Sequence, residues 1–220
     1  MIAETLMSNS IVPLRWTDTG DDALRMMEDF HVRHLPIVDQ DQKLVGMISE
    51  EDALNSEGDL EMSAYSFSLP PLYVHSYDHI YEVMRLLAEY HLTIVPVVDK
   101  EQHYLGLITM ERSLHHFAEM SAFKEPGCIL VLEVGKRDYS MAEIARIVES
   151  ENAVILSSFV TVVPDSMRIE VTLKINRQQI QSLVSTFERF NYQIKASFNE
   201  SDYLDTLQER YDALMSYLNV

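Results

Sequence analysis

The chain repeats itself once, with a spacing of 60 residues and no gap. The segment 32–39, Val-Arg-His-Leu-Pro-Ile-Val-Asp, aligns with the segment 92–99, Leu-Thr-Ile-Val-Pro-Val-Val-Asp. Of the 43 positions in 12–54, 11 are identical in 72–114, and most of the others are like-for-like exchanges. Two copies are too few for a solenoid, in which at least three repeats stack. The repeat therefore predicts two similar lobes that pack about a pseudo-twofold axis.

Each lobe predicts the same order of elements. In the first lobe, residues 21–30 carry apolar side chains at helical spacing, and Thr19 is a candidate N-cap before an acidic first turn. Residues 35–38 and 43–49 predict two short strands joined by a polar hairpin, and a second helix follows them. Because Pro36 has no backbone N–H for a sheet ladder, it is expected at the start of a strand or on an edge.

This order resembles the cystathionine β-synthase (CBS) domain, with its apolar-Pro-apolar-Val-Asp and Gly-apolar-Ile-Ser/Thr segments between two helices. Two such domains in tandem resemble the paired CBS module, also called the Bateman module. The resemblance implies an α+β fold with one CBS domain over 1–60 and a second over 61–122, each of the β-α-β-β-α type. It also implies a regulatory role.

The resemblance further implies a ligand, because paired CBS domains commonly bind adenosine nucleotides in clefts between the two lobes. In the family pattern Gly-apolar-x-Ser/Thr-x-x-Asp, the hydroxyl and the carboxylate face the ribose and the phosphate. The first repeat matches this pattern with Gly46, Ser49 and Asp52. Arg33 and His34 stand before the proline, where the family often has basic residues, and an arginine can hold a phosphate through two hydrogen bonds. AMP, ADP, ATP and S-adenosylmethionine, with or without Mg²⁺, are the candidate ligands.

The second repeat departs from the family pattern. It keeps Gly106 and Thr109, but Arg112 replaces the aspartate, and Thr93-Ile94 replaces the basic pair. At most one nucleotide site is therefore expected to be intact. Thr109 and Arg112 stay candidate contacts of an altered second site, where Arg112 would face a phosphate.

A purely structural explanation is open for the residues of the first site. Ser49 and Asp52 are both favoured residue types at a helix start, so they could be caps of the following helix. Arg33 and His34 could lie on a solvated surface. Residues 1–60 hold 13 acidic and 4 basic side chains, so an AMP-like ligand suits the site better than free ATP, unless Mg²⁺ accompanies the ATP.

The pattern changes after Pro126-Gly127. Ser140 and Glu143 have the spacing of a capping box, and a second helix is expected around Leu183 and Phe187. The predicted order βαββαβ is the ferredoxin-like arrangement. Placed after a CBS pair, residues 126–198 resemble an ACT domain, and the whole layout resembles the acetoin-utilisation regulatory protein B type of chain. The predicted strands are 128–134, 154–163, 167–174 and 192–198.

Two roles are open for the ACT-like domain. Ligand-binding ACT domains usually carry Asp and Gly in the first strand–helix loop, whereas residues 136–140 read Lys-Arg-Asp-Tyr-Ser, without glycine. A sheet-forming role in dimerisation or coupling is therefore favoured over amino-acid sensing. Residues 201–219 predict a C-terminal helix with an apolar seam that either docks onto its own domain or pairs with a second chain. A homodimer is expected.

The chain carries 17 Lys and Arg against 35 Asp and Glu, a formal net charge of −18. Phosphate backbones and anionic membrane surfaces repel such a chain, so neither nucleic acid nor a membrane is an expected partner. No run of about 18 apolar residues suits a membrane span, and the first residues do not resemble a signal peptide. Cys128, the single cysteine, cannot form an intrachain disulfide. We expect a cytoplasmic protein.

No catalytic constellation is visible. The sequence has no P-loop, no Gly-x-Gly-x-x-Gly, no Gly-x-Ser-x-Gly and no His-Glu-x-x-His motif. Neither enzymatic activity nor a bound metal is expected. The leading hypothesis is a regulatory protein whose CBS pair senses an AMP-like nucleotide and relays its occupancy to the ACT-like domain or to a partner. The alternatives are a structural dimerisation protein with empty CBS sites and an amino-acid sensor.

Overall fold

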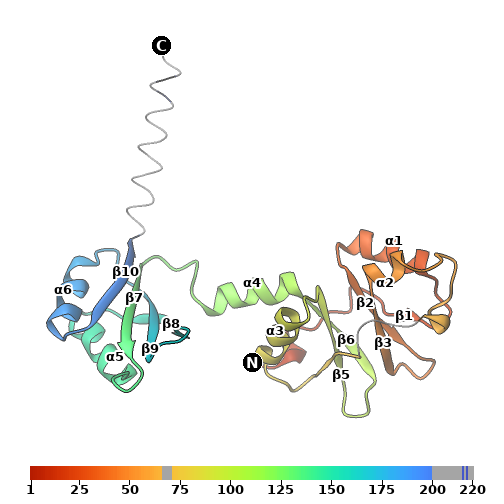
Figure 1. The fold of residues 1–220 in the computed structure, drawn as a ribbon, viewed down its shortest axis with the longest axis horizontal. Helices are drawn as coiled ribbons and strands as arrows, with labels where there is room; N and C mark the ends of the chain where they lie inside the picture. Colours follow the sequence, from red (N-terminus) through yellow and green to blue (C-terminus); the bar gives the residue numbers. More distant parts are fainter. Residues whose placement is uncertain (66–70, 200–214, 216, 218–220) are drawn as a thin grey trace. The chain divides into compact units, whose positions relative to one another are not determined.

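The chain folds into two compact units, residues 1–116 and the residues from 117 onward. The boundary falls within helix α4 (Met110–Met120). Both units mix helices and strands (Figure 1). Among the described residues, no helix combines the length and the apolar character that a bilayer-spanning segment needs. The structure, a computed structural model, describes residues 1–65, 71–199, 215 and 217.

The first lobe of the first unit has the expected β-α-β-β-α order, and its elements are β1 (Leu14–Arg15), α1 (Gly20–Phe30), β2 (His34–Val38), β3 (Leu44–Ser49) and α2 (Glu50–Leu54). β2 is the central strand, with β1 parallel and β3 antiparallel to it. The Thr19 hydroxyl accepts from the backbone N–H of Asp22 at 3.3 Å, and the Asp22 carboxylate accepts from the Thr19 N–H at 3.0 Å. This reciprocal capping box confirms the predicted start of α1.

The second lobe repeats the first, with β4 (Val74–His75), α3 (Ile80–Glu89), β5 (Ile94–Val98), β6 (Tyr104–Thr109) and α4. Its sheet has the same order, β4-β5-β6. Pro96 lies opposite Leu107 just as Pro36 lies opposite Met47. The lobes thus share one strand register at the 60-residue spacing. The described part of the unit also contains two short 3₁₀ helices, Ala3–Thr5 and Met62–Ala64.

The prediction for Pro36 is wrong. Pro36 is the third of five residues in β2, the middle strand of its sheet. The position tolerates proline because β1 is only two residues long and pairs with Ile37 and Val38 alone. Pro36 therefore lies beyond the end of that pairing, where a missing N–H leaves no ladder bond unmade.

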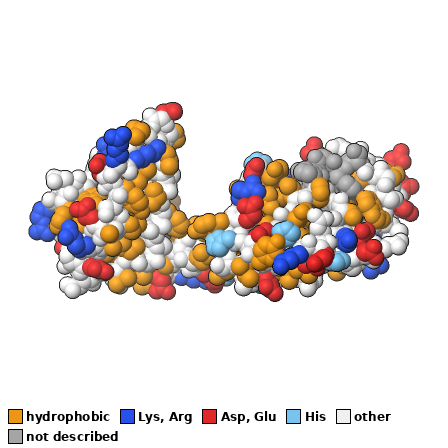
Figure 2. Space-filling model, turned by 90° about the horizontal axis from the view of Figure 1, so that it is seen from below, with side chains coloured by type: hydrophobic (Ala, Val, Ile, Leu, Met, Phe, Trp, Pro, Cys, Tyr) orange, Lys and Arg blue, Asp and Glu red, His pale blue; other side chains and the backbone are white. Residues whose placement is uncertain are grey.

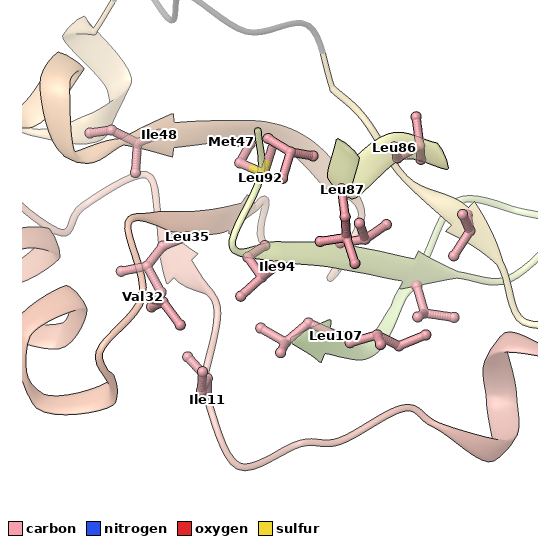
Figure 3. Packing of buried hydrophobic residues seen from close by; sticks show 14 of the residues in the cluster. Ile11, Val32, Leu35, Met47, Ile48, Leu86, Leu87, Leu92, Ile94 and Leu107 are labelled. Atoms are coloured by element: carbon pink, nitrogen blue, oxygen red, sulfur yellow. The ribbon is translucent and has the colours of Figure 1, made fainter. Parts of the chain in front are cut away.

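One hydrophobic core joins the two lobes (Figure 3). Val32, Leu35 and Met47 of the first lobe and Leu92 and Ile94 of the second belong to the same buried cluster, and each is at most 6% exposed. Burial of apolar surface from both lobes in one cluster fixes how the lobes pack within the unit.

The hairpin tips of the lobes exchange hydrogen bonds in a symmetric way. The N–H of Leu44 donates to the carbonyl of Gln102 at 3.1 Å, and the N–H of Tyr104 donates to the carbonyl of Gln42 at 2.8 Å. Leu44 and Tyr104 are equivalent in the repeat, as are Gln42 and Gln102. This reciprocity agrees with a pseudo-twofold axis between the lobes.

The second unit contains, in chain order, β7 (Cys128–Gly135), α5 (Met141–Ser150), β8 (Ile155–Val162), β9 (Arg168–Ile175), α6 (Gln181–Arg189) and β10 (Gln193–Asn199). These four strands form an antiparallel sheet in the order β10-β7-β9-β8. Alternate residues of β7 and β9 are buried on one face, against the two helices. Cys128 is fully buried in this core, and burial raises the pKa of its thiol, as expected for a packed thiol.

Only half of the predicted capping box at α5 forms. The Ser140 hydroxyl accepts from the backbone N–H of Glu143 at 3.3 Å. The Glu143 carboxylate instead accepts from the Tyr192 hydroxyl at 3.0 Å, and burial raises the pKa of Tyr192 to about 12. Tyr192, a partner distant in the sequence, thus replaces the backbone N–H of Ser140 as the donor to the Glu143 carboxylate. The predicted C-terminal helix 201–219 lies outside the described residues, except for Met215 and Tyr217, which are helical.

The face of the molecule drawn in Figure 2 mixes charges of both signs with exposed apolar side chains. In the second unit the exposed apolar side chains include Phe159, Val160 and Val162 of β8. β8 is an edge strand of its sheet.

Candidate functional site

A hollow of about 260 Å³ lies where the first lobe meets the end of α3 in the second lobe. Three of the predicted contact residues line it, and His34 and Ser49 are opposite each other in the β2–β3 ladder. The strand pairing therefore brings together two residues that are 15 positions apart. The full lining is Arg33, His34, Ser49, Glu50, Glu51, Tyr90 and His91.

Ser49 and Asp52 form the capping box of α2. The Ser49 hydroxyl accepts from the backbone N–H of Asp52 at 3.0 Å, and the Asp52 carboxylate accepts from the Ser49 N–H at 3.1 Å. The same carboxylate lies 2.8 Å from the Ser49 hydroxyl. Asp52 is not among the residues that line the hollow. Capping thus accounts for the pair in this structure, as one of the two sequence interpretations has it.

Arg33 forms an ion pair with Glu50. Its Nε donates to Glu50 Oε2 at 2.8 Å, and the two side chains are 72% and 38% exposed. An ion pair this exposed contributes about 0–1 kcal/mol. An anion that enters the hollow can therefore displace the carboxylate from the guanidinium at small cost, but it must then lie beside Glu50.

His34 is half-buried and bonded across the lobes to Thr93. The backbone N–H of Thr93 donates to His34 Nδ1 at 3.2 Å, and Thr93 Oγ1 lies 3.1 Å from the same nitrogen. Burial lowers the pKa of His34, and the charge of Arg33 lowers it further, whereas Asp52 and Glu50 act in the opposite direction. The neutral imidazole is therefore favoured near neutral pH.

Thr109 and Arg112 do not join this hollow. Thr109 ends β6, and its hydroxyl accepts from the backbone N–H of Arg112 at 3.2 Å at the start of α4. Arg112 is exposed, and neither residue lines the hollow around Arg33. The Thr109 hydroxyl thus accepts from the backbone N–H of Arg112 as the Ser49 hydroxyl accepts from that of Asp52, but Thr109 does not line the hollow.

Five residues at or beside the hollow are not among the sequence candidates. They are Glu50, Glu51, Tyr90, His91 and Thr93. The repeat held a signal for two of them: Thr93 is the counterpart of Arg33, and His91 aligns with an identical His31. Both histidines have a φ of 53° just after their helices. Tyr90 and His91 come from the other lobe, and only the packing of the lobes brings them here.

Metal-ligating side chains gather at a different place, in the hairpin of the second lobe. The ligand atoms of Asp99, Glu101 and His103 lie within 4.8 Å of one another. Asp99 is already engaged: its Oδ1 accepts from the N–H groups of Glu101 and His103, and its Oδ2 is 3.0 Å from His103 Nδ1. The three side chains therefore lie close together because these hydrogen bonds close the hairpin.

Comparison with known families decides what this architecture is. The model of the CBS domain matches residues 3–59 and again residues 62–112. The chain belongs to the CBS domain family. Its two lobes are a tandem CBS pair, and the resemblance inferred from the repeat is confirmed. Paired CBS domains are generally regulatory, ligand-sensing modules.

Several curated relatives of this CBS pair are much longer proteins. Homoserine O-acetyltransferase of Methanobrevibacter ruminantium is 27% identical over 115 residues, which are 52% of this chain and 24% of that protein. Inosine-5'-monophosphate dehydrogenase of Methanocaldococcus jannaschii is 22% identical over 143 residues, 64% of this chain and 29% of that protein. The chain thus spans only about a quarter of the length of these relatives.

The CBS pair is similar to solved structures. A CBS domain pair/ACT domain protein from Thermotoga maritima superposes with a TM-score of 0.50 at 23% identity, over 54% of this chain and 98% of that chain. A Vibrio cholerae protein named for acetoin utilization has a TM-score of 0.48 at 23% identity, over 57% of this chain and 96% of that chain.

Proposed function

We propose that the CBS pair is a regulatory module that binds an AMP-like adenosine nucleotide in the hollow around Arg33. The observation that carries the proposal is the convergence of a guanidinium, an imidazole and a serine hydroxyl in one hollow that the second lobe completes. Arg33 would hold the phosphate. Tyr90 and His91 supply ring surfaces from the other lobe. Ser49 would contact the ribose or phosphate while it caps α2, and Asp52 would act through Ser49.

Size and charge favour a mononucleotide over a triphosphate. The volume of the hollow, about 260 Å³, is slightly below the range of ordinary ligand pockets, which is about 300–1,000 Å³. Two carboxylates, Glu50 and Glu51, line it together with a single guanidinium. Each further phosphate charge adds repulsion. ADP or ATP would need Mg²⁺ to offset that repulsion, and S-adenosylmethionine, which carries no phosphate, is the comparison ligand.

Isothermal titration calorimetry of the full chain with AMP, ADP, ATP and S-adenosylmethionine, with and without Mg²⁺, tests the proposal. Arg33→Gln should weaken AMP binding about 10–100-fold, because it removes a charged hydrogen bond. Arg25→Gln is the matched control: Arg25 is also 72% exposed and also pairs with one carboxylate, that of Asp22, away from the hollow. If no nucleotide releases heat, or if both variants bind alike, the nucleotide proposal fails.

The hollow also provides a means of signalling, because residues of both lobes line it. A ligand shifts the arrangement of the lobes only to the extent that it binds one arrangement better. We propose that occupancy is relayed to an ACT-like ferredoxin fold in the second unit. The order β7-α5-β8-β9-α6-β10 and the sheet order β10-β7-β9-β8 support that assignment.

A second candidate function, amino-acid sensing, rests on a hollow of about 380 Å³ in the second unit. Arg168 lines it together with Asp138 of the β7–α5 loop and Glu143, so groups for both a carboxylate and an ammonium are present. Arg168 already pairs with Glu133, which an amino acid would have to displace. Thermal-shift measurements with the twenty amino acids test this function, and an unchanged melting temperature with all of them excludes it.

That the protein is a cytoplasmic homodimer stays a prediction. If the protein is only an assembly module with empty CBS sites, deletion of 201–220 should change the mass measured by light scattering. Nucleotides should then leave the melting temperature unchanged.

A further inference from the structure

Thr93 forms hydrogen bonds across the lobes to two residues, Arg33 and His34. The backbone N–H of Arg33 donates to Thr93 Oγ1 at 2.8 Å, and that oxygen lies 3.1 Å from His34 Nδ1. The backbone N–H of Thr93 also donates to His34 Nδ1, at 3.2 Å. Thr93 belongs to the second lobe, and Arg33 and His34 belong to the first.

The direction of these hydrogen bonds follows from the groups involved. A backbone N–H can only donate, so His34 Nδ1 must accept and cannot carry a proton. Thr93 Oγ1 accepts from the N–H of Arg33 on a lone pair, and its own O–H donates to Nδ1, whose single lone pair is shared with the Thr93 N–H. The ring is then neutral, and its one proton is on Nε2. Among the described residues, none is recorded as a partner of Nε2.

We propose that Thr93 is a positioning residue of the ligand hollow, which holds His34 as a neutral imidazole whose Nε2–H donates to the ligand. The ligand part of this inference rests on the proposed function, whereas the state of the ring does not. An Nε2–H donor selects an acceptor oxygen, such as that of a phosphate or a ribose hydroxyl, and adds no positive charge.

This role explains why the second repeat departs from the family pattern. Thr93 is the counterpart of Arg33, and Ile94, the counterpart of His34, is fully buried in the shared core. The second lobe has therefore not simply lost its basic pair. One of the two positions supports the site of the first lobe, and the other packs the core that joins the lobes.

The same arrangement makes the link between the lobes sensitive to pH. A proton on Nδ1 would replace an acceptor by a donor, so the bond from the backbone N–H of Thr93 would be lost and the bond from its hydroxyl would have to reverse. Burial is the largest effect against that proton, and Arg33, the residue before β2, also opposes it, whereas Asp52 and Glu50 on α2 favour it. Glu51, Tyr90 and His91 are the other titratable groups that line the hollow.

Nuclear magnetic resonance of ¹⁵N-labelled imidazoles in the ligand-free full chain tests the state of the ring, and His34→Gln assigns the signal. Wild type should show the Nε2–H tautomer and a midpoint below that of an ordinary histidine. Thr93→Val, which keeps the shape and the backbone N–H, should raise the midpoint by about 0.5–1 pH unit. Thr93→Ser, which keeps the hydroxyl, should restore it. An Nδ1–H tautomer in wild type, or a midpoint equal in all three proteins, overturns the inference.

Calorimetry with AMP separates this inference from the proposed function. Thr93→Val should weaken AMP binding about 3–10-fold, and Thr93→Ser should bind within a factor of about two of wild type. If AMP binds none of the proteins, the proposed function fails while the resonance data still decide the role of Thr93. If AMP binds and the two variants are equal, the positioning role is refuted. Matching melting temperatures would show that both variants fold.

Discussion

Replacement of Glu50 by glutamine should strengthen the binding of AMP. Glu50 is the ion-pair partner of Arg33, with Arg33 Nε and Glu50 Oε2 2.8 Å apart, and it lines the hollow. A phosphate that binds Arg33 must displace this carboxylate and then lie close to it. Glutamine has nearly the same shape without the charge. The variant therefore frees the guanidinium and removes a repulsion in one step.

The size of the effect follows from exposure and distance. The pair is 72% and 38% exposed, so breaking it costs about 0–1 kcal/mol. A carboxylate and a phosphate charge roughly 6 Å apart repel by about 0.7–2.8 kcal/mol for dielectric constants between 80 and 20, and the open surface favours the low end. The sum is about 1–2 kcal/mol, which is an affinity gain of about 5–30-fold.

Glu51→Gln is the matched control. Glu51 is the next residue of α2, also lies in the first helical turn and also lines the hollow, but it makes no recorded ion pair with Arg33. The Glu51→Gln substitution removes the same charge, and the same interaction with the helix dipole, as Glu50→Gln does. We expect the affinity of this variant for AMP to rise only about two- to threefold, because the substitution weakens the repulsion of the phosphate but does not free Arg33.

Calorimetry with AMP at about 0.05 M and 0.3 M salt measures both variants, and screening should shrink both gains at the higher salt. The reasoning is refuted if Glu50→Gln binds AMP no better than wild type. Equal gains for the two variants would instead show that release of Arg33 contributes nothing.

Four further predictions concern stability. Because the folded pKa of His34 lies below its ordinary value, the unfolded chain binds a proton first as the pH falls. The stability that this group contributes is therefore present above about pH 6.5 and lost below it. Urea unfolding between pH 5 and 8 should show a smaller change of the unfolding free energy with pH in His34→Gln than in wild type. Ser49→Ala removes the cap of α2 and should cost about 1 kcal/mol in the same assay, and no loss would contradict the capping role. Gly106→Ala should destabilise by about 1–3 kcal/mol, because a Cβ there would lie 2.9 Å from the carbonyl oxygen of Ser8; wild-type stability would mean that the N-terminal segment yields freely. Leu35→Ala, at 0% exposure, should cost about 2–5 kcal/mol, whereas Leu54→Ala, at 66% exposure, should change stability by less than about 0.5 kcal/mol, and similar losses would mean that α2 packs against something else in solution.

Much of the first unit can be read from the sequence because its signals are local. A capping box needs only residues three apart, so the start of α1 at Thr19 was predictable and is confirmed. The same locality made Ser49 and Asp52 ambiguous. A serine three residues before an aspartate suits both a helix cap and a ribose contact, and the sequence contains nothing that separates the two.

Long-range pairing accounts for the predictions that failed. Glu143 has the spacing of a capping box, but its carboxylate bonds to Tyr192, which is 49 residues away. Pro36 looks like an edge residue, but it lies in the central strand because the neighbouring strand is too short to need its N–H. In both cases a tertiary neighbour decided between options that were locally equal.

The sequence by itself determined the duplication, the order of elements in each lobe and three of the residues that line the hollow, because periodicity, turn residues and caps act over a few positions. Only the tertiary structure decided which residues meet there. The packing of the two lobes about one core brings Thr93 to His34 and sets Tyr90 and His91 beside Arg33. These residues are about sixty positions apart, and no local preference of the backbone reaches that far.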